Sequence, residues 1–474
     1  MQTSLFVSTR CPECNGSARH LEGAHTFTCS FCASVLRCQT EGRTLKYVIS
    51  PRLERDEIVV AFNEAFNKAL PNSVSTSGSA EVSPCRPGRI KTIYKPFWYC
   101  KGMVYSCHSS GTKNGLDARA WSHTFEANSS VASALTTLGL RSEVLEADGF
   151  DSEQFGADDI VLPITKSKEE ARKEAVAAAE WGVENPGWKY HETTIVGERF
   201  VLLYYPVIAV EYSDKEENGT TVALFDGVAG TGLGKEVYNK EESTEVPGNA
   251  EQEYRVKFVT HRCANCGHDL KPGDSALFFH CAECSRLWLL DGDDYRQQKI
   301  TLLAANDGFK GAYIPFWRFE LSLSSKAAGL ELGRIGDLAE FMRMGRHTLR
   351  DEAPERPLRF FVPAMLAPNP GAVIKLAARI GTFQKELPVE PGEVAESDDF
   401  LNVSLPVQDA KEMLRPLIFL VIGRIDREAV KFYSDFEITV AKKELVWYPF
   451  EEKGAYLLDP FHNYTFPRRS LVEG

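Results

Sequence analysis

Eight of the twelve cysteines stand in four Cys-x-x-Cys pairs, and the pairs form two sets with one spacing. In the first set, Cys11-Pro-Glu-Cys14 is followed after 14 residues by Cys29-Ser-Phe-Cys32. In the second set, Cys263-Ala-Asn-Cys266 is followed, again after 14 residues, by Cys281-Ala-Glu-Cys284. A pair on a tight turn points two thiolates at one ion, and two such turns complete a tetrahedral site. The spacing therefore predicts two zinc ribbons, each with four cysteine ligands.

Thiolates are soft ligands that favour zinc, and a tetrahedral set of four sulfurs also suits iron. We expect one Zn²⁺ at each site, with rubredoxin-like iron as the alternative. Four cysteine ligands leave no open position for water or substrate, so both ions are predicted to be structural. His268 and His280 adjoin the ligand pairs and are alternative ligands. A third site formed by Cys85, Cys100 and Cys107 is a weaker hypothesis because its spacing is irregular.

The composition is that of a globular protein. The chain has 474 residues, 43% of them hydrophobic, and 54 Lys and Arg against 66 Asp and Glu give a net charge of −12. At roughly 100–200 residues per domain the length predicts about three to four domains. The acidic balance argues against a surface that wraps nucleic acid, although it permits a local basic patch. No apolar run reaches the roughly 18–20 residues of a membrane span. Without a signal segment, closely spaced cysteines favour metal binding in the cytoplasm.

Several landmarks recur in the same order in two parts of the chain. All four cysteine positions of the first set reappear 252 residues later. Other pairs are Tyr94–Trp98 with Tyr313–Trp317 (Tyr-x-Pro-Phe-Trp), Val161–Ile164 with Ser404–Val407, Tyr204–Pro206 with Trp447–Pro449, and Leu224–Gly227 with Leu457–Pro460. This order predicts a tandem duplication with halves of about 240 residues. A charged Pro/Gly segment near 240–253 is the predicted linker.

Periodicity between the landmarks predicts alternating helices and strands. Helical spacing marks Glu54–Leu70, and Ser167-Lys-Glu-Glu170 is a capping box for a helix through about Trp181. Asp409 is the predicted cap of a helix that runs to Arg415, where Pro416 forces a kink or break. The predicted strands are Arg199–Tyr212, Thr220–Phe225, Leu358–Pro363 and Phe436–Tyr448.

The predicted fold class is α+β, with each half a four-cysteine zinc ribbon followed by small mixed-sheet α+β modules. The expected units are ribbon 1 (1–45), modules 46–150 and 151–245, ribbon 2 (255–295), and modules 296–388 and 400–474. Each module containing a Tyr-x-Pro-Phe-Trp motif is expected to carry it on a strand.

A basic and aromatic segment between Val82 and Leu116 offers one alternative function. It holds no acidic residue, and cations alternate with aromatic side chains, as in proteins that bind single strands. The candidate nucleic-acid residues are Arg86, Arg89, Lys91, Lys95 and Lys101. The equivalent second segment keeps the aromatics but has only Arg318 as a charge, which favours a core role for the aromatics.

No catalytic residues can be nominated. Histidines are scattered, and the glycine-rich Ala229–Glu236 fails the phosphate-loop pattern because Glu236 replaces the magnesium-binding Ser or Thr. The protein is therefore predicted not to be an enzyme. An enzyme with a site between the halves stays open, because duplicated modules can enclose a cleft.

The ribbons, the repeated Tyr-x-Pro-Phe-Trp, Phe361–Ala364 and the Leu-Phe-Asp-Gly run resemble a poorly characterised family of bacterial double zinc-ribbon proteins. Its members are labelled as transcription-factor-B-type zinc-ribbon proteins or after the primosomal replication factor Y. Some have transmembrane helices and are found beside genes for phage-shock-A-like and SPFH proteins. The resemblance implies a membrane-stress or envelope context and supplies the eight cysteine ligands. This chain departs from it by lacking a transmembrane helix and helicase motifs.

The leading hypothesis is a soluble, non-enzymatic zinc protein that acts as a scaffold or adaptor for protein partners, with a homo-oligomer as one form of that role. Nucleic-acid binding through residues 82–116 is the second hypothesis. Electron transfer by iron in the four-cysteine sites is the third.

Overall fold

The computed structural model describes residues 5–39, 44–66, 86–110, 113–130, 135–139, 145–180, 187–213, 220–237, 257–304, 309, 311–344, 353–392, 399–424 and 426–471. These residues form a mixed α+β fold that consists mostly of sheet, which confirms the predicted class. The predicted linker near 240–253 and Cys85 lie outside the described residues. No helix in the described ranges is both long enough and apolar enough to cross a bilayer.

Ten strands of the first half form one sheet. They are β1 (Phe6–Arg10), β2 (Ser17–Leu21), β5 (Lys46–Val48), β6 (Pro87–Ser109), β7 (Asn114–Glu126), β8 (Glu146–Gly149), β9 (Ile160–Val161), β10 (Tyr190–Ser213), β11 (Thr220–Asp226) and β12 (Gly232–Val237). The long strands β6 and β10 pair antiparallel along most of their length. Helices α1 (Arg55–Phe66) and α3 (Lys168–Glu180) and the short helix η1 (Ser152–Gln154) accompany this sheet.

Nine strands of the second half form the other large sheet. They are β17 (Ile300–Leu303), β18 (Gly311–Ser325), β19 (Leu330–Leu332), β20 (Leu358–Pro363), β21 (Val389–Gly392), β22 (Asp399–Phe400), β23 (Glu437–Lys453), β24 (Tyr456–Asp459) and β25 (Tyr464–Pro467). The helices are α4 (Ile335–Phe341), α5 (Pro370–Phe383), α6 (Val407–Glu412), α7 (Leu414–Ile422) and α8 (Arg427–Asp435), with short helices η4 (Ala353–Glu355) and η5 (Arg468–Ser470).

Two small sheets belong to the ribbons. The first contains β3 (Thr26–Thr28), β4 (Val35–Gln39) and β13 (Lys257–Thr260). The second contains β14 (Phe278–His280), β15 (Leu287–Asp291) and β16 (Asp294–Gln298).

The large sheets extend beyond the small ones that the sequence predicts. In each half, a Tyr-x-Pro-Phe-Trp strand from one predicted module pairs with a long strand from the next, β6 with β10 and β18 with β23. Apart from the half-buried Tyr313, the aromatic residues of the motifs are buried on these strands, which favours one continuous sheet over two separate cores. The two predicted α+β modules of each half therefore share a sheet.

Local signals predicted some element boundaries well and others poorly. The Ser167 hydroxyl accepts from the Glu170 N–H and the Glu170 carboxylate accepts from the Ser167 N–H, which confirms the capping box of α3. The predicted cap at Asp409 is wrong, because α6 begins at Val407 and Asp409 is its third residue. The break predicted near Pro416 occurs at Met413, so the proline lies in the first turn of α7, where its missing N–H costs nothing.

The two halves repeat the same strand registers. Pro96 lies opposite Tyr204, and Pro315 lies opposite Trp447. The Trp98 indole donates to the Lys166 carbonyl and the Trp317 indole to the Leu405 carbonyl, both at 2.9 Å. Lys166 is therefore the counterpart of Leu405. The sequence match of Val161–Ile164 with Ser404–Val407 pairs Leu405 with Leu162 instead. The structural alignment of this segment therefore differs from the sequence match by four residues.

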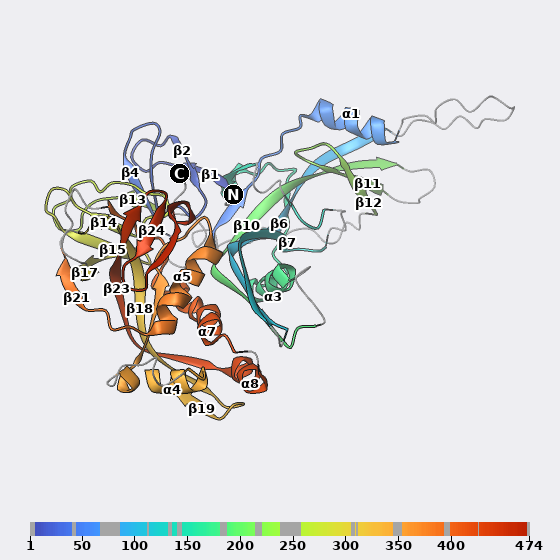
Figure 1. Cartoon of the computed structure of the whole chain (residues 1–474). Coiled ribbons are helices and arrows are strands. Elements are labelled where there is room, and N and C mark those ends of the chain that lie inside the picture. The colour runs from blue at the N-terminus through green and yellow to red at the C-terminus, as the bar shows by residue number, and fades with distance from the viewer. Residues whose placement is uncertain are drawn as a thin grey trace.

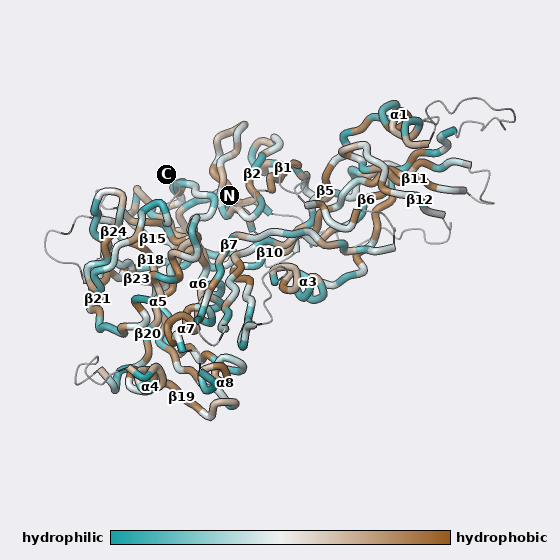
Figure 2. The backbone as a smooth tube through the Cα atoms, turned by 45° about the vertical axis from the view of Figure 1, so that its right-hand side comes forward, coloured by the Kyte–Doolittle hydropathy of each residue, from teal (hydrophilic) through white to brown (hydrophobic). Residues whose placement is uncertain are grey.

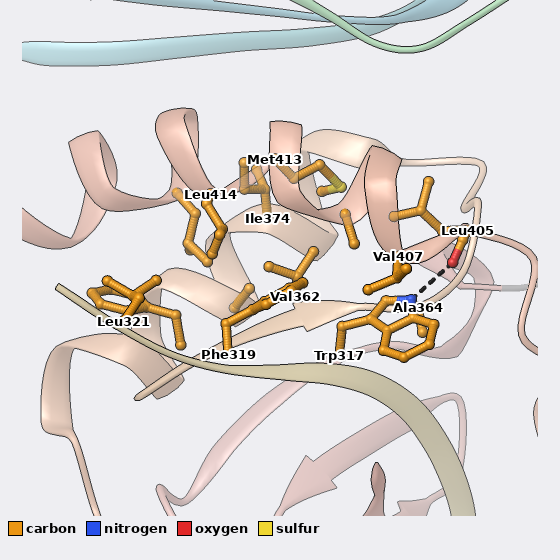
Figure 3. Close-up of a cluster of buried hydrophobic side chains, with 14 of the residues drawn as sticks. Trp317, Phe319, Leu321, Val362, Ala364, Ile374, Leu405, Val407, Met413 and Leu414 are labelled. Atoms are coloured by element: carbon orange, nitrogen blue, oxygen red, sulfur yellow. Dashed lines mark hydrogen bonds between the residues drawn. The ribbon is translucent and has the colours of Figure 1, made fainter. Parts of the chain in front are cut away.

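A shared apolar core joins the halves. Met103 and Val196 of the first half pack in the same cluster as Leu414 and Phe419 of α7. The Tyr190 ring stacks on Phe419 with their centroids 5.5 Å apart. Figure 1 shows α5 and α7 lying between the two sheets, and Figure 2 shows that α7 is largely hydrophobic. In Figure 3, Leu414 points from α7 toward the Phe319 and Leu321 side chains of β18. The halves are therefore packed together rather than merely tethered.

Candidate functional site

All four Cys-x-x-Cys pairs adopt the same turn. The N–H of the first cysteine donates to the carbonyl five residues later, which belongs to Gly16, Ser34, His268 or Arg286. The carbonyl of the same cysteine accepts from the N–H four residues later. That fourth residue has a positive φ in each turn, namely Asn15 at 59°, Ala33 at 60°, Gly267 at 75° and Ser285 at 54°. Repetition of one turn presents the two sulfurs of each pair to a common point.

The turns bring the predicted ligands together in two groups, and within each group the sulfurs lie within 4.8 Å of one another. The Sγ atoms of Cys11 and Cys32 are 3.8 Å apart, as are those of Cys14 and Cys29. The corresponding separations in the second group are 3.6 Å and 3.5 Å. Four sulfurs about 2.3 Å from a central zinc lie about 3.8 Å apart in a tetrahedron. The two clusters thus fit two structural metal sites, and His268 and His280 are not needed as ligands.

Each cluster is buried on one side only. The first cysteine of each pair is buried, whereas Cys14, Cys32 and Cys266 are exposed and Cys284 is half-buried. Phe27 and Leu36 pack with Cys11 and Cys29 in a small apolar cluster beneath the first site. Each ribbon is too short to bury a large apolar core, so binding of the metal would supply much of the free energy that stabilises its fold.

The second site has a hydrogen bond that the first lacks. The Trp288 indole donates to the Cys263 sulfur at 3.2 Å. Leu36 occupies the equivalent position of the first ribbon, 252 residues earlier, and has no donor. A donor to a ligating sulfur orients it and tunes its bond to the metal.

Hydrogen bonds favour the thiolate, the form that binds metal, at Cys32 and Cys263. At Cys14 and Cys266 a backbone hydrogen bond acts in the same direction, but desolvation and hydrogen bonds with neighbouring thiols outweigh it and raise the pKa of both to about 12. A hydrogen bond with the Ser34 side chain lowers the pKa of Cys32 to about 6. Burial opposes ionisation of Cys263, but backbone N–H groups of Cys266 and Asn265 outweigh it and lower its pKa to about 6.

The ribbons are joined to each other. Strand β13, which leads into the second ribbon, pairs antiparallel with β4 of the first. The backbone N–H of His25 donates to the Asp274 carbonyl at 2.7 Å. The counterpart of β13 in the first half, β1, instead pairs with β2 and β8 in the large sheet. Figure 1 shows β4 and β13 at the same end of the molecule.

The basic and aromatic segment forms part of the core. Its aromatic residues Tyr94, Phe97, Trp98, Tyr99 and Tyr105 are all buried. Four of its five candidate cations face carboxylates, in the pairs Arg89–Asp158, Lys91–Glu211, Lys95–Glu126 and Lys101–Glu22, and Arg86 is exposed. Residues 86–110 therefore offer no exposed ring for base stacking. Nucleic-acid binding by this segment stays a prediction.

The other cysteines do not assemble a third site within the described residues. Cys100 packs in the cluster that contains Trp98, whereas Cys107 packs on the opposite face of β6 with Tyr105. Two thiols on opposite faces of one strand cannot share an ion. Cys38 is half-buried on β4. The two four-cysteine groups are the metal-ligand clusters found in the part of the chain that the structure describes.

A buried charge cluster lies beside the first ribbon, and sequence reasoning missed it. The Glu22 side chain is 0% exposed, and its carboxylate lies 2.6 Å from Lys101 Nζ and 3.3 Å from an Arg199 nitrogen. Lys101 Nζ also donates to the Glu22 carbonyl at 2.6 Å. Burial acts to raise the pKa of Glu22, but the two cations outweigh it and lower the pKa to about 2. No local motif reveals this cluster, because the three residues are far apart in sequence.

Comparison of the chain with protein-family models, with curated proteins and with solved structures finds no match.

Proposed function

We propose that this chain is a non-enzymatic zinc protein, built by tandem duplication, whose two four-cysteine ribbons hold together a scaffold for protein partners. The observation that carries the proposal is the pair of four-cysteine clusters, in each of which the sulfurs lie within 4.8 Å of one another. A shell of four cysteines leaves no position for water or substrate, so the ion contributes to folding rather than to chemistry.

The duplication is supported by matched geometry in the halves. The two Tyr-x-Pro-Phe-Trp strands have the same register against their long partners. The Tyr205 hydroxyl donates to Asp226 at 2.7 Å, and the Tyr448 hydroxyl to Asp459 at 2.8 Å. These buried pairs occupy equivalent places after equivalent strands.

The scaffold role is supported by the way the ribbons connect the halves. Because β13 of the second half completes the sheet of the first ribbon, ordering of one ribbon supports the other. The resemblance to bacterial double zinc-ribbon proteins extends the proposal to an assembly associated with the envelope or with membrane stress.

Native mass spectrometry of protein purified from its own host, with metal analysis of the same sample, tests the proposal. We expect two zinc ions and a co-purifying protein. Iron in the sites would replace the proposal with electron transfer, and bound oligonucleotide would replace it with nucleic-acid binding.

Cysteine variants test whether partner binding depends on the metal. Cys14→Ser and Cys266→Ser should each lose one zinc ion and the co-purifying partner. Cys38→Ser changes a cysteine that is not a ligand and should keep both zinc ions and the partner. An unchanged melting temperature after verified zinc loss would contradict the structural role of the metal.

A further inference from the structure

A cavity of about 430 Å³ lies where the two halves and the two ribbons meet. One wall comes from β6 and β10, including Lys101, Met103 and Arg199. The opposite wall includes Leu405 and Asp409, at the start of α6. Loops of both ribbons close one end. A cavity of this size, with apolar walls and a few converging polar groups, is typical of a small-molecule site.

One part of the cavity carries net positive charge. Lys101 and Arg199 share the single carboxylate of Glu22, which leaves one positive charge in excess in this group, while the exposed Asp274 of the second ribbon also lines the cavity. Their side chains keep 21% and 34% of their surface exposed, although Glu22 beneath them is fully buried. Arg199 has five N–H donors, and its contact with Glu22 uses only part of them. Glu22 thus fixes two cations whose free donors are available to a ligand.

Gly23 allows the cations to reach this position. It adopts φ +85°, and a Cβ there would lie 3.1 Å from both Lys101 Nζ and Arg199 Nε. A side chain at this position would be strained at this φ and would force the two cations to shift by a few tenths of an ångström.

The opposite wall carries a carboxylate that makes no direct ion pair in the part of the chain that the structure describes, although Arg199 lies within electrostatic range of it. Among the described residues, no hydrogen bond or ion pair reaches the half-buried Asp409 side chain. The Oδ2 atom of Asp409 lies close to Gly197 of β10. A Cβ atom added to Gly197 would be 3.2 Å from this oxygen. Burial raises the pKa of Asp409, although Arg199 attracts it and so lowers the pKa. Neighbouring Glu198 is already paired with Arg172 at 2.7 Å. A half-buried carboxylate with no partner is stabilised by a cation that enters the cavity.

We propose that this cavity binds a small zwitterion of the α-amino-acid type. The carboxylate of the ligand would contact Arg199 and Lys101, its ammonium group would contact Asp409, and its side chain would lie against Met103 and Leu405. The opposite charges on the two walls favour a ligand that carries both charges over a simple anion or cation. The proposal does not depend on the identity of the metal or on the scaffold role.

Calorimetric titration of the metal-loaded full chain with each of the common L-amino acids, one at a time, tests the proposal. We expect at least one to bind at millimolar concentration. The deaminated acid and the decarboxylated amine of that amino acid should each bind about tenfold more weakly or worse, because each loses one charge-assisted contact.

The variant Asp409→Asn locates the ammonium contact. It should weaken binding of the amino acid about tenfold or more and leave binding of the deaminated acid unchanged. Glu340→Gln, which removes an exposed carboxylate from α4, is the matched control and should change neither.

Two results would overturn the proposal. One is the absence of binding heat for every amino acid. The other is an amino acid whose affinity is the same in wild type and Asp409→Asn. Asp409→Asn could fail to fold, which loss of a metal ion would reveal. In that case the wild-type protein tests the proposal through its affinities for the amino acid, the deaminated acid and the decarboxylated amine. Equal affinities for the three would reject a zwitterion site.

Discussion

Thr26 of the first ribbon and Gly273 of the second are joined by two reciprocal hydrogen bonds. The Thr26 hydroxyl donates to the Gly273 carbonyl at 2.9 Å and accepts from the Gly273 N–H at 2.8 Å. Thr26 is 0% exposed, whereas Gly273 is half-buried. One hydroxyl therefore satisfies both backbone groups of a residue 247 positions away.

Replacing this hydroxyl should weaken the contact between the ribbons. Thr26→Val keeps the shape but leaves the Gly273 N–H without its partner, at a cost of about 1–3 kcal/mol, whereas the Gly273 carbonyl keeps its hydrogen bond from the Ala276 N–H. Thr28→Val on the same strand is the control, because Thr28 is exposed and its loss should cost less than about 0.5 kcal/mol. Urea denaturation measures both free energies of unfolding. Equal effects of the two substitutions would mean that the reciprocal bonds contribute nothing.

The two metal sites should differ in their response to Trp288→Phe. The change removes the donor to the Cys263 sulfur and keeps an aromatic ring in the core. Loss of an outer-shell partner typically weakens metal binding about 10–100-fold. Competition with a chelator should therefore show the second site releasing its ion more readily. The first site is an internal control, since Leu36 offers no such bond. Equal weakening of both sites, or of neither, would contradict this role for Trp288.

The sequence was most informative where a structure depends on neighbouring residues. The spacing of the cysteines predicted both clusters, because a Cys-x-x-Cys turn is local and repeats the same hydrogen bonds. The capping box at Ser167 and the strand Leu358–Pro363 were confirmed for the same reason. Each depends on contacts or patterns within a few residues.

The features that the sequence did not predict depend on distant partners. Lys101 was a candidate for nucleic-acid binding because its segment is basic, yet in the fold it pairs with Glu22 at a sequence separation of 79. The size of the sheets follows from the pairing of β6 with β10, which no local pattern specifies. The crossing of β13 to the first ribbon depends on the packing of one half against the other.

Glu22 should make the protein sensitive to acid. The fall in its pKa from 4.5 to about 2 corresponds to about 3 kcal/mol of stability. Because the folded-state pKa is lowered, this contribution is present above about pH 4.5 and is lost as the pH falls toward about 2. Glu22→Gln should therefore be destabilised by about 3 kcal/mol at neutral pH and by roughly half as much or less near pH 3.

The control for this pH dependence is Glu169→Gln, which removes an exposed carboxylate on α3 and should follow the wild type throughout. Release of metal in acid affects all three proteins, so the difference between variants isolates Glu22. A constant gap between Glu22→Gln and wild type from pH 7 to pH 3, measured by urea denaturation, would show that the carboxylate acts without its charge.

Glu412 should have the opposite effect on pH dependence. Partial desolvation of Glu412, which is exposed overall at the end of α6 but lies close to β10, raises its pKa to about 7, with further contributions from Asp409 and Glu198. A raised pKa means that the fold favours the protonated acid, so stability falls as the pH rises from about 4.5 to about 7 and stays low above it. Glu412→Gln mimics the protonated form and should raise the melting temperature more at pH 8 than at pH 5. Glu340→Gln, exposed on α4, should change it equally little at both. An increase in melting temperature for Glu412→Gln that is the same at pH 5 and pH 8 would contradict a raised pKa of Glu412. It would show that Asp409 and Glu198 do not disfavour ionisation of Glu412 where α6 meets β10.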